Sequence, residues 1–293
     1  MPELPEVETI ANGLRQGGEE QPTIVGMTIE QAHLLWPRTL AEPAPEAFQA
    51  RLPGQKIQAI SRRGKFLVFH LSQDNLLIHL RMSGDLIVEP NTAEVAPHHR
   101  LMLDLQDGWR LAFNDTRKFG RVWLVADPLS VLGGLGPEPL DPAFTDQAFH
   151  QDLLKTRRAI KPLLLDQSFI AGLGNIYTDE ALYLSRLHPL TPANILNAEQ
   201  AAQLLSGIRQ VLQAGIQHHG ASIDWVYRGG DFQNFFYVYQ RTGQPCRGCG
   251  APIQRIILGQ RGAHFCPVCQ KSVSSIKQGM KPRSSAGLRE AKP

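Results

Sequence analysis

The chain has 293 residues, of which 30 are Lys or Arg and 27 are Asp or Glu, and its formal net charge is +3. With 42% apolar and 19% charged residues, its composition is that of a globular protein and excludes a wholly disordered chain. No run approaches the roughly 18 apolar residues of a transmembrane helix, and the start of the chain lacks the features of a secretory signal. We therefore expect a cytoplasmic protein with no membrane partner.

The positive charge is concentrated at the C-terminal end. Residues 241–293 hold ten Lys or Arg and one acid, Glu290, which gives a net charge of +9. The 240 residues before them hold 20 basic and 26 acidic side chains, a net charge of −6. A basic module on a mildly acidic body favours a polyanionic partner, most simply nucleic acid. The alternative is a solvated tail, and residues 272–293 are polar and unpatterned enough to predict a disordered basic tail.

The first residues predict a short extended end that leads into a buried helix. Pro5 suits the first turn of a helix, and Glu6 and Glu8 favour the same end through the helix dipole. Apolar residues then recur at the spacing of one helical face. They are Val7, Ile10, Ala11 and Leu14. This pattern places the terminal amine near the body of the protein.

Short apolar runs separated by Gly, Asp, Asn and Pro follow this helix. Their close spacing predicts a mostly antiparallel β-sandwich, which we assign to an N-terminal domain over residues 1–132. The predicted strand regions are 23–35, 65–71, 75–82, 85–89, 100–105, 109–113 and 121–126.

The apolar pattern changes to a helical period after a Gly- and Pro-rich connector at 133–142. We expect a helical domain over residues 133–240, in which Asn197 and Gln200 resemble a capping box. Asn175 follows a Gly-rich turn at a helix start. Such a turn either presents backbone amides to a phosphate or is a tight helix–helix turn with a capping Asn.

Four cysteines predict a metal site in a third module, residues 241–271. Two thiolate pairs at this spacing suit one tetrahedral, structural Zn²⁺, and the alternatives are a redox dithiol or an iron–sulfur cluster. Two strand-like segments between the pairs predict a hairpin, with Arg261 at its turn between Gly259 and Gly262 and free to reach a phosphate. The four residues are Cys246, Cys249, Cys266 and Cys269, with sixteen residues between the pairs.

The first two residues after Met1 carry a possible nucleophile and a proton-transfer group. Removal of Met1 leaves Pro2 as a secondary α-amine, and an α-amine has a pKa near 8, far below that of Lys. Such an amine can attack a sugar carbon and form an iminium, and Glu3 beside it can move protons. The alternative is that the Met-Pro start has no chemical role.

Two further turns carry side chains suited to damaged DNA. Lys65 lies between a tight turn and a strand, where it serves in phosphate binding or proton transfer, or is simply a surface lysine. Met82 ends a strand region, and Arg117 and Phe119 lie in one turn. An apolar wedge beside an arginine can fill the gap that a flipped nucleotide leaves in a duplex.

Taken together, these stretches resemble the formamidopyrimidine-DNA glycosylase family, the bacterial 8-oxoguanine DNA glycosylase/lyases. The resemblance runs from Met1 to about Lys271 and implies an α+β multidomain fold. That fold consists of an N-terminal β-sandwich with an N-terminal helix, a helix-two-turn-helix domain and a C-terminal zinc-finger β-hairpin. The matching motifs, in order, are MPELPEVET, RRGKFL, HLRMSG, DTRKFG, LGPEPL, GLGNIYTDEAL and the four-cysteine segment with QRGAHFCPVCQ.

The resemblance also implies roles for individual residues. Pro2 attacks the deoxyribose of an oxidised purine nucleotide, Glu3 transfers the proton, Lys65 serves β-elimination, and Arg261 serves δ-elimination and phosphate binding. Loop 221–236 closes over the everted base. The DNA-contacting residues that it implies are Met82, Arg117 and Phe119 as void fillers, Asn175 on the backbone phosphate, and His98 and Arg157 as further DNA contacts.

The partner implied is damaged double-stranded DNA, bound by a monomer that has one structural Zn²⁺ and no small-molecule cofactor. Two alternatives remain. The first is the sister endonuclease VIII family, which acts on oxidised pyrimidines; Leu4 and the Met82, Arg117 and Phe119 trio favour the purine enzyme over it. The second is a non-catalytic zinc-containing DNA-binding protein.

Overall fold

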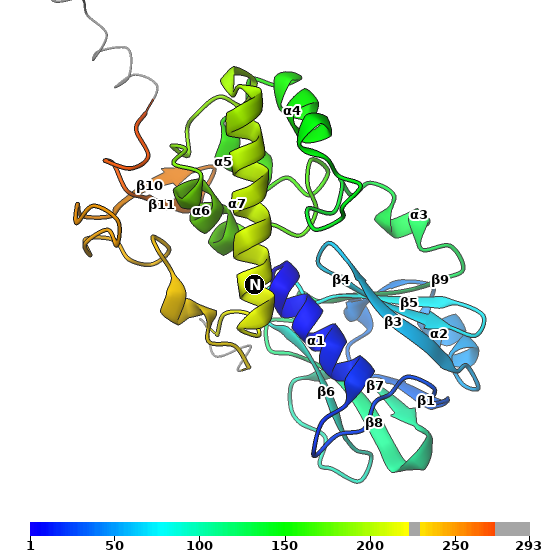
Figure 1. Ribbon diagram of the computed structural model, residues 1–293. Coiled ribbons are helices and arrows are strands. Elements are labelled where there is room, and N and C mark those ends of the chain that lie inside the picture. Colours follow the sequence, from blue (N-terminus) through cyan, green and yellow to red (C-terminus); the bar gives the residue numbers. More distant parts are fainter. Residues whose placement is uncertain (223–228, 273–293) are drawn as a thin grey trace, which may run out of the picture.

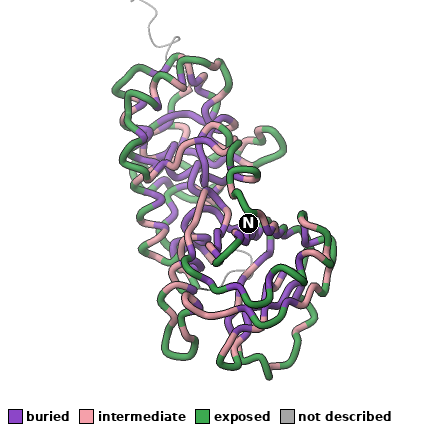
Figure 2. Tube along the Cα trace, turned by 90° about the vertical axis from the view of Figure 1, so that its right-hand side faces the viewer, coloured by how far each residue is buried: buried purple, intermediate pink, exposed green. Residues whose placement is uncertain are grey.

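The structure is a computed structural model that describes residues 1–222 and 229–272. Figure 1 shows a β-sheet lobe and a helical lobe, with the zinc-finger hairpin beside the helices and the N-terminus between the lobes. Buried chain runs through both lobes, as Figure 2 shows. None of the helices in these described ranges is long and apolar enough to cross a membrane.

The sheet lobe is the expected β-sandwich. One sheet is antiparallel throughout and has β1 (Ile29–Leu34), β7 (His99–Leu105), β8 (Trp109–Asp115) and β6 (Gly84–Pro90) in that spatial order. The other has β2 (Leu40–Glu42), β9 (Arg121–Val125), β5 (Asn75–His79), β4 (Phe66–Leu71) and β3 (Ile57–Arg63), with only β2 and β9 parallel. The apolar residues that alternate along these strands form one core between the sheets.

Helix α1 (Leu4–Gln16) belongs to both lobes. Its predicted apolar face is buried in the sandwich core. Leu4, one turn earlier, packs instead in the core of the helical lobe, and its N–H donates to the carbonyl of Gly172 at 3.0 Å. The first helix therefore fixes the start of the chain at the junction of the two lobes.

The helical lobe is built on α7 (Ala198–Gln217). The predicted capping box is present, because Asn197 Oδ1 accepts from Gln200 N at 2.8 Å and Gln200 Oε1 accepts from Asn197 N at 3.2 Å. The other helices of this lobe are α4 (Asp146–Leu154), α5 (Ile160–Leu164) and α6 (Asn175–Leu184), while α2 (Pro45–Arg51) and α3 (Leu129–Leu132) lie outside it.

Glu138, in the connector between the lobes, binds the turn before β4. Its Oε1 accepts from Gly64 N at 2.5 Å and from the guanidinium groups of Arg62 and Arg63 at 3.1 and 2.9 Å. This turn immediately precedes Lys65, so the clamp holds the start of β4 against the connector.

A hairpin of β10 (Gln254–Leu258) and β11 (Arg261–Phe265) lies against α6. The turn is Gly259 and Gln260, both with positive φ, as a two-residue type I′ turn requires. Arg261, expected at the turn itself, is the first residue of β11 and pairs with Leu258. The two-residue turn thus displaces Arg261 by one position.

A buried ion pair attaches this hairpin to the helices. Lys161 and Asp179 are completely buried, with Lys161 Nζ 2.5 Å from Asp179 Oδ1 and 2.7 Å from the carbonyl of Gly262. The other carboxylate oxygen of Asp179 accepts from the backbone N–H of His264 at 2.9 Å and lies 3.0 Å from its Nδ1. This network fixes the strand that carries Arg261.

Asp179→Ala should lower the free energy of unfolding by about 3–5 kcal/mol, because it leaves the Lys161 ammonium buried without its counterion. Urea unfolding followed by circular dichroism measures the loss. Asp152→Ala is the control, because it removes the exposed partner of Lys155 and should cost less than about 1 kcal/mol. Equal losses in the two variants would contradict the role given to the buried pair.

Candidate active site

The Glu3 carboxylate binds the N-terminal end of α6. Glu3 is 2% exposed, and its oxygens accept from the backbone N–H groups of Gly174, Ile176 and Tyr177 at 2.7, 3.0 and 3.4 Å. A helix N-terminus favours a negative charge, so α6 orients this side chain. The residue after Pro2 is thereby held by a helix more than 170 positions away in the sequence.

Two glycines before α6 make this approach possible. A Cβ on Gly174 would lie 2.2 Å from Cδ of Glu3, and a Cβ on Gly172 would lie 2.6 Å from a side-chain carbon of Leu4. The phosphate-binding interpretation of these backbone amides was therefore wrong, because Glu3 uses them. The capping interpretation of Asn175 was also wrong, since Gly174 is the N-cap and Asn175 is the first helical residue.

Glu6 holds the backbone on the other side of Glu3. The Glu6 carboxylate accepts from the Glu3 N–H, the Tyr177 hydroxyl and the Ala221 N–H, each at 2.8 Å. The sequence suggested only a helix-dipole role for Glu6. Its contacts show that it fixes the position of Glu3, and with it the adjacent Pro2, which is buried.

The structure brings Lys65 into electrostatic range of both Glu3 and Arg261. Burial raises the pKa of Glu3, and the charge of Lys65 opposes this increase. Burial lowers the pKa of Lys65 to about 8, with the Arg261 charge acting in the same direction and the Glu3 charge opposing it. A carboxyl group with a raised pKa beside an amine with a lowered one is an arrangement suited to proton transfer near neutral pH.

His79, which the sequence did not single out, lies next to Lys65. Burial, assisted by the charges of Arg81 and Lys65, lowers the pKa of His79 to about 3, so the ring is neutral. Its Nδ1 accepts from the N–H of Arg81 at 3.0 Å, which leaves Nε2 as the N–H donor. In the sequence, the basic residues around His79 were the available signal of its role. The strand register that places His79 beside Phe66 could not be read from the sequence.

The predicted void-filling residues form an exposed group supported by a buried aspartate. Met82 and Phe119 are 37% and 52% exposed, and the Arg117 guanidinium lies 5.2 Å from the Phe119 ring centre. Asp115 is completely buried and accepts from Ser83 Oγ and from the N–H groups of Arg117 and Gly120. Asp115 therefore joins the Met82 turn to the Arg117–Phe119 turn, a role that sequence reasoning missed.

The other predicted DNA contacts differ in their surroundings. Asn175 Oδ1 is buried at the start of α6 and has no hydrogen-bond partner in the part of the chain that the structure describes. His98 is exposed with its Nδ1 3.2 Å from Arg100 Nη2, and Arg157 is exposed. Within residues 1–222 and 229–272, no hydrogen bond joins His98 or Arg157 to Glu3 or Lys65. The predicted loop 221–236 lies partly outside the described residues, as does the predicted tail after residue 272.

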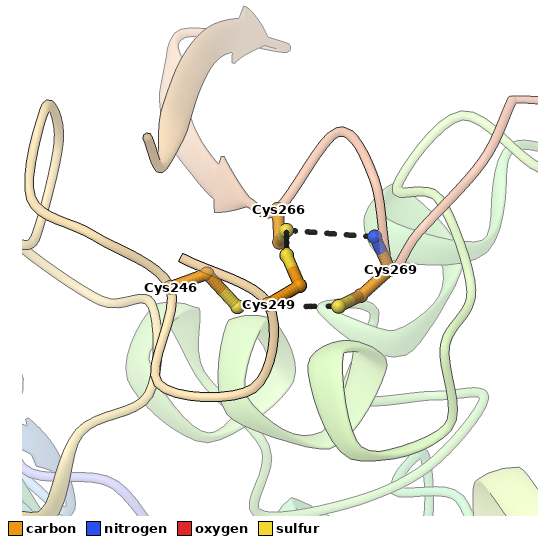
Figure 3. A group of neighbouring side chains, drawn as sticks. All are labelled: Cys246, Cys249, Cys266 and Cys269. Carbon is orange, nitrogen blue, oxygen red and sulfur yellow. Dashed lines mark hydrogen bonds between the residues drawn. The ribbon is translucent and has the colours of Figure 1, made fainter. Parts of the chain in front are cut away.

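The four cysteines gather their sulfur atoms at the base of the hairpin (Figure 3). All four sulfurs lie within 4.8 Å of one another. Cys246 and Cys269 are 3.9 Å apart and Cys249 and Cys266 are 3.4 Å apart, close to the roughly 3.8 Å expected for a tetrahedron with Zn–S bonds of about 2.3 Å. The set fits one zinc ion held by four thiolates, which is a closed, structural site.

Three family models match the sequence in chain order. The formamidopyrimidine-DNA glycosylase N-terminal domain matches residues 1–122, its H2TH domain matches 135–226, and the zinc finger found in FPG and IleRS matches 243–271. A formamidopyrimidine-DNA glycosylase of Protochlamydia amoebophila is 44% identical over 92% of this chain and 100% of its own length. The chain belongs to the formamidopyrimidine-DNA glycosylase family.

Further relatives and solved structures agree with this assignment. A formamidopyrimidine-DNA glycosylase of Chloroflexus aurantiacus is 48% identical over 92% of this chain and 98% of its own. Lactococcus lactis Fpg (MutM), solved in complex with DNA that contains an oxidised pyrimidine, has a TM-score of 0.85 and 38% identity over 92% of this chain and 100% of its own. A MutM complex with DNA that contains carbocyclic 8-oxo-G has the same values.

The ionisation of Lys65 can be followed directly. In ¹³C NMR of the Lys Cε signals, Lys65 should titrate near pH 8, more than two units below solvent-exposed lysines. Glu3→Gln should lower this midpoint further, because it removes the negative charge that stabilises the ammonium. Glu20→Gln changes an exposed carboxylate and should leave the midpoint unchanged. A Lys65 midpoint near 10 would contradict the buried environment described above.

Proposed function

We propose that this protein is a base-excision repair enzyme, a bifunctional DNA glycosylase and abasic-site lyase. Its substrates are oxidised purines, 8-oxoguanine and formamidopyrimidines, in double-stranded DNA. The observation that carries the proposal is the buried Glu3, oriented by α6 and coupled to Lys65, directly beside Pro2. Family membership and the exposed Met82, Arg117 and Phe119 group support the same conclusion.

Pro2 is the proposed nucleophile once Met1 has been removed. The nitrogen of Pro2 forms a bond to the anomeric carbon of the deoxyribose and loses its proton. The glycosidic bond to the damaged base breaks, and the leaving base takes up that proton. Glu3 transfers the proton that opens the sugar ring, which gives an iminium (Schiff base) at Pro2. Proton transfer by a positioned group contributes about 10²–10⁴-fold to such a step.

Strand cleavage then follows from the same iminium by β- and δ-elimination. Each elimination removes a proton from the sugar, and the C3′–O bond and then the C5′–O bond break with the phosphate as leaving group. Lys65 serves β-elimination and contacts phosphate. Because its pKa is lowered to about 8, the Lys65 amine is neutral in about a tenth of the molecules at pH 7. Arg261 serves δ-elimination and phosphate binding at the start of β11, where the Lys161 and Asp179 network holds it. The zinc site is structural and supports this hairpin from its base.

The remaining predicted residues bind the duplex. Met82, Arg117 and Phe119 fill the gap left by the flipped nucleotide, with Arg117 facing the orphaned cytosine. Flipping costs a few kcal/mol, which wedge insertion and phosphate contacts offset. Asn175 holds backbone phosphate, and His98 and Arg157 make further DNA contacts. Asn175 Oδ1 has no hydrogen-bond partner among the described residues, which supports its share of this role.

In this proposal the chain consists of three domains and a C-terminal tail. They are the catalytic sandwich domain (1–132), the helix-two-turn-helix domain (133–240), the zinc finger (241–271) and the basic tail (272–293). A monomeric enzyme without a small-molecule cofactor, working in the cytoplasm at the nucleoid of a bacterium-like cell, remains a prediction.

The endonuclease VIII-like activity on oxidised pyrimidines is the second candidate. The Lactococcus lactis relative was solved with DNA that contains an oxidised pyrimidine, so relatives of this fold bind such lesions. Excision from a duplex with 8-oxoguanine opposite cytosine should be faster than from one with thymine glycol. The reverse order would favour the pyrimidine-directed activity.

Sodium borohydride should trap the proposed intermediate as a covalent protein–DNA adduct, because reduction makes the Schiff base permanent. The duplex carries 8-oxoguanine opposite cytosine, and mass spectrometry of the digested adduct should place the DNA on Pro2. Protein that retains Met1 is the matched control and should give no adduct. An adduct on Lys65, or equal trapping with Met1 retained, would contradict Pro2 as the nucleophile.

A further inference from the structure

Four side chains next to the void-filling turn form a second positively charged surface, here called the Trp36 cluster. It consists of Trp36, Arg38, Lys118 and Arg121. The Lys118 ammonium lies 4.1 Å from the Trp36 ring centre, and the Arg38 guanidinium carbon lies 5.9 Å from it. Arg121 donates from Nη1 to the carbonyl of Arg38. The three cations are exposed.

The backbone conformation of the turn directs the side chain of Lys118 away from those of Arg117 and Phe119. Lys118 has a φ of 60°, a left-handed conformation that a lysine rarely adopts. Arg117 and Phe119, on either side of it, pack against each other, while Lys118 packs on Trp36. A single turn therefore serves two surfaces, the void-filling group and the Trp36 cluster.

Buried contacts hold Trp36 in place. Its N–H donates to the carbonyl of Arg100 at 3.0 Å, and Arg100 Nε donates to the carbonyl of Asp115 at 2.7 Å. Asp115 also supports the void-filling turn, so both surfaces share one rigid base. These contacts fix the backbone that carries Trp36, and the ring of Trp36 is a platform on which the Lys118 ammonium lies.

The cations of the Trp36 cluster have no carboxylate partner within residues 1–222 and 229–272. Among the residues that the structure describes, none of the ion pairs includes Arg38, Lys118 or Arg121. Many other basic residues of this mildly acidic body are paired with carboxylates. Three unpaired cations around one aromatic ring are suited to a polyanion.

The sheet register relates this cluster to the active site. Arg121 on β9 lies opposite His79 on β5, and His79 lies opposite Phe66 on β4, the residue after Lys65. Neighbouring strands are about 4.8 Å apart, so two strand spacings separate the backbone of Arg121 from that of Phe66. Arg121 is thus about 10 Å from the start of β4. Arg38 precedes β2, the strand at the sheet edge beside β9, and Lys118 precedes β9.

We propose that the Trp36 cluster binds phosphates of the undamaged DNA strand, opposite the strand that Lys65 and Arg261 hold. This inference rests on the proposed function. A minor groove is about 6 Å wide. The cluster begins about 10 Å along the sheet from the start of β4 and includes Lys118, from the same turn as the proposed wedge residues Arg117 and Phe119. At this separation we expect it to meet the other sugar–phosphate backbone.

The test measures binding to a duplex that carries a tetrahydrofuran abasic-site analogue, over a range of salt concentrations. Lys118→Ala should weaken binding on the order of ten-fold, as for one hydrogen bond to a charged group. It should also reduce the slope of log K against log[salt] by about 1, as for one lost phosphate contact.

Lys56→Ala is the matched control. Lys56 is exposed and precedes β3, at the opposite edge of the same sheet from β2 and at the opposite end from Arg121. Its removal changes the net charge equally and should leave affinity and salt slope unchanged. Equal effects of Lys56→Ala and Lys118→Ala would overturn the proposal.

Neutral methylphosphonates, placed one at a time in either strand, identify the strand that is bound. The penalty of Lys118→Ala should disappear when the neutral linkage is in the undamaged strand near the lesion and persist when it is in the damaged strand. The opposite pattern, or a penalty that no undamaged-strand substitution removes, would overturn the proposal. Borohydride trapping with the same wild-type preparation reports on the proposed function separately.

Discussion

The hydrogen bonds between the Glu3 carboxylate and the first N–H groups of α6 are the constraint on which the rest of the active site depends. They join the second residue of the proposed mature chain to the helical lobe, while the remainder of α1 packs in the sandwich. The proposed nucleophile Pro2, the proposed proton-transfer group Glu3 and the lobe junction are therefore one structural unit. A displacement of either lobe would therefore also displace Pro2 and Glu3.

This constraint explains several features that look unrelated in the sequence. Gly174 lacks a side chain because the Glu3 carboxyl occupies that space, and Gly172 leaves room for Leu4. Glu6 fixes the Glu3 backbone through contacts to both lobes. Burial then raises the pKa of Glu3 and lowers that of Lys65, so the same packing that positions these groups also sets their protonation.

Local patterns in the sequence were sufficient where the signal itself is local. The apolar face of α1, the Asn197 capping box and the cysteine spacing each follow from a few neighbouring residues. Strand β3 and helix α2 were missed. Strand β3, an edge strand, has only two buried apolar residues, and α2 buries only Phe48. Contacts that depend on register or on distant segments, such as those of Asp115 and Glu138, have no local signal.

The most direct test of the account is the single-turnover rate of 8-oxoguanine excision by Gly174→Ala. A Cβ at this position would lie 2.2 Å from Cδ of Glu3, and a displacement of about 1 Å can reduce a rate on the order of 10²-fold. The account predicts such a loss in folded protein that still binds the abasic-analogue duplex. Excision at the wild-type rate by this variant would contradict it.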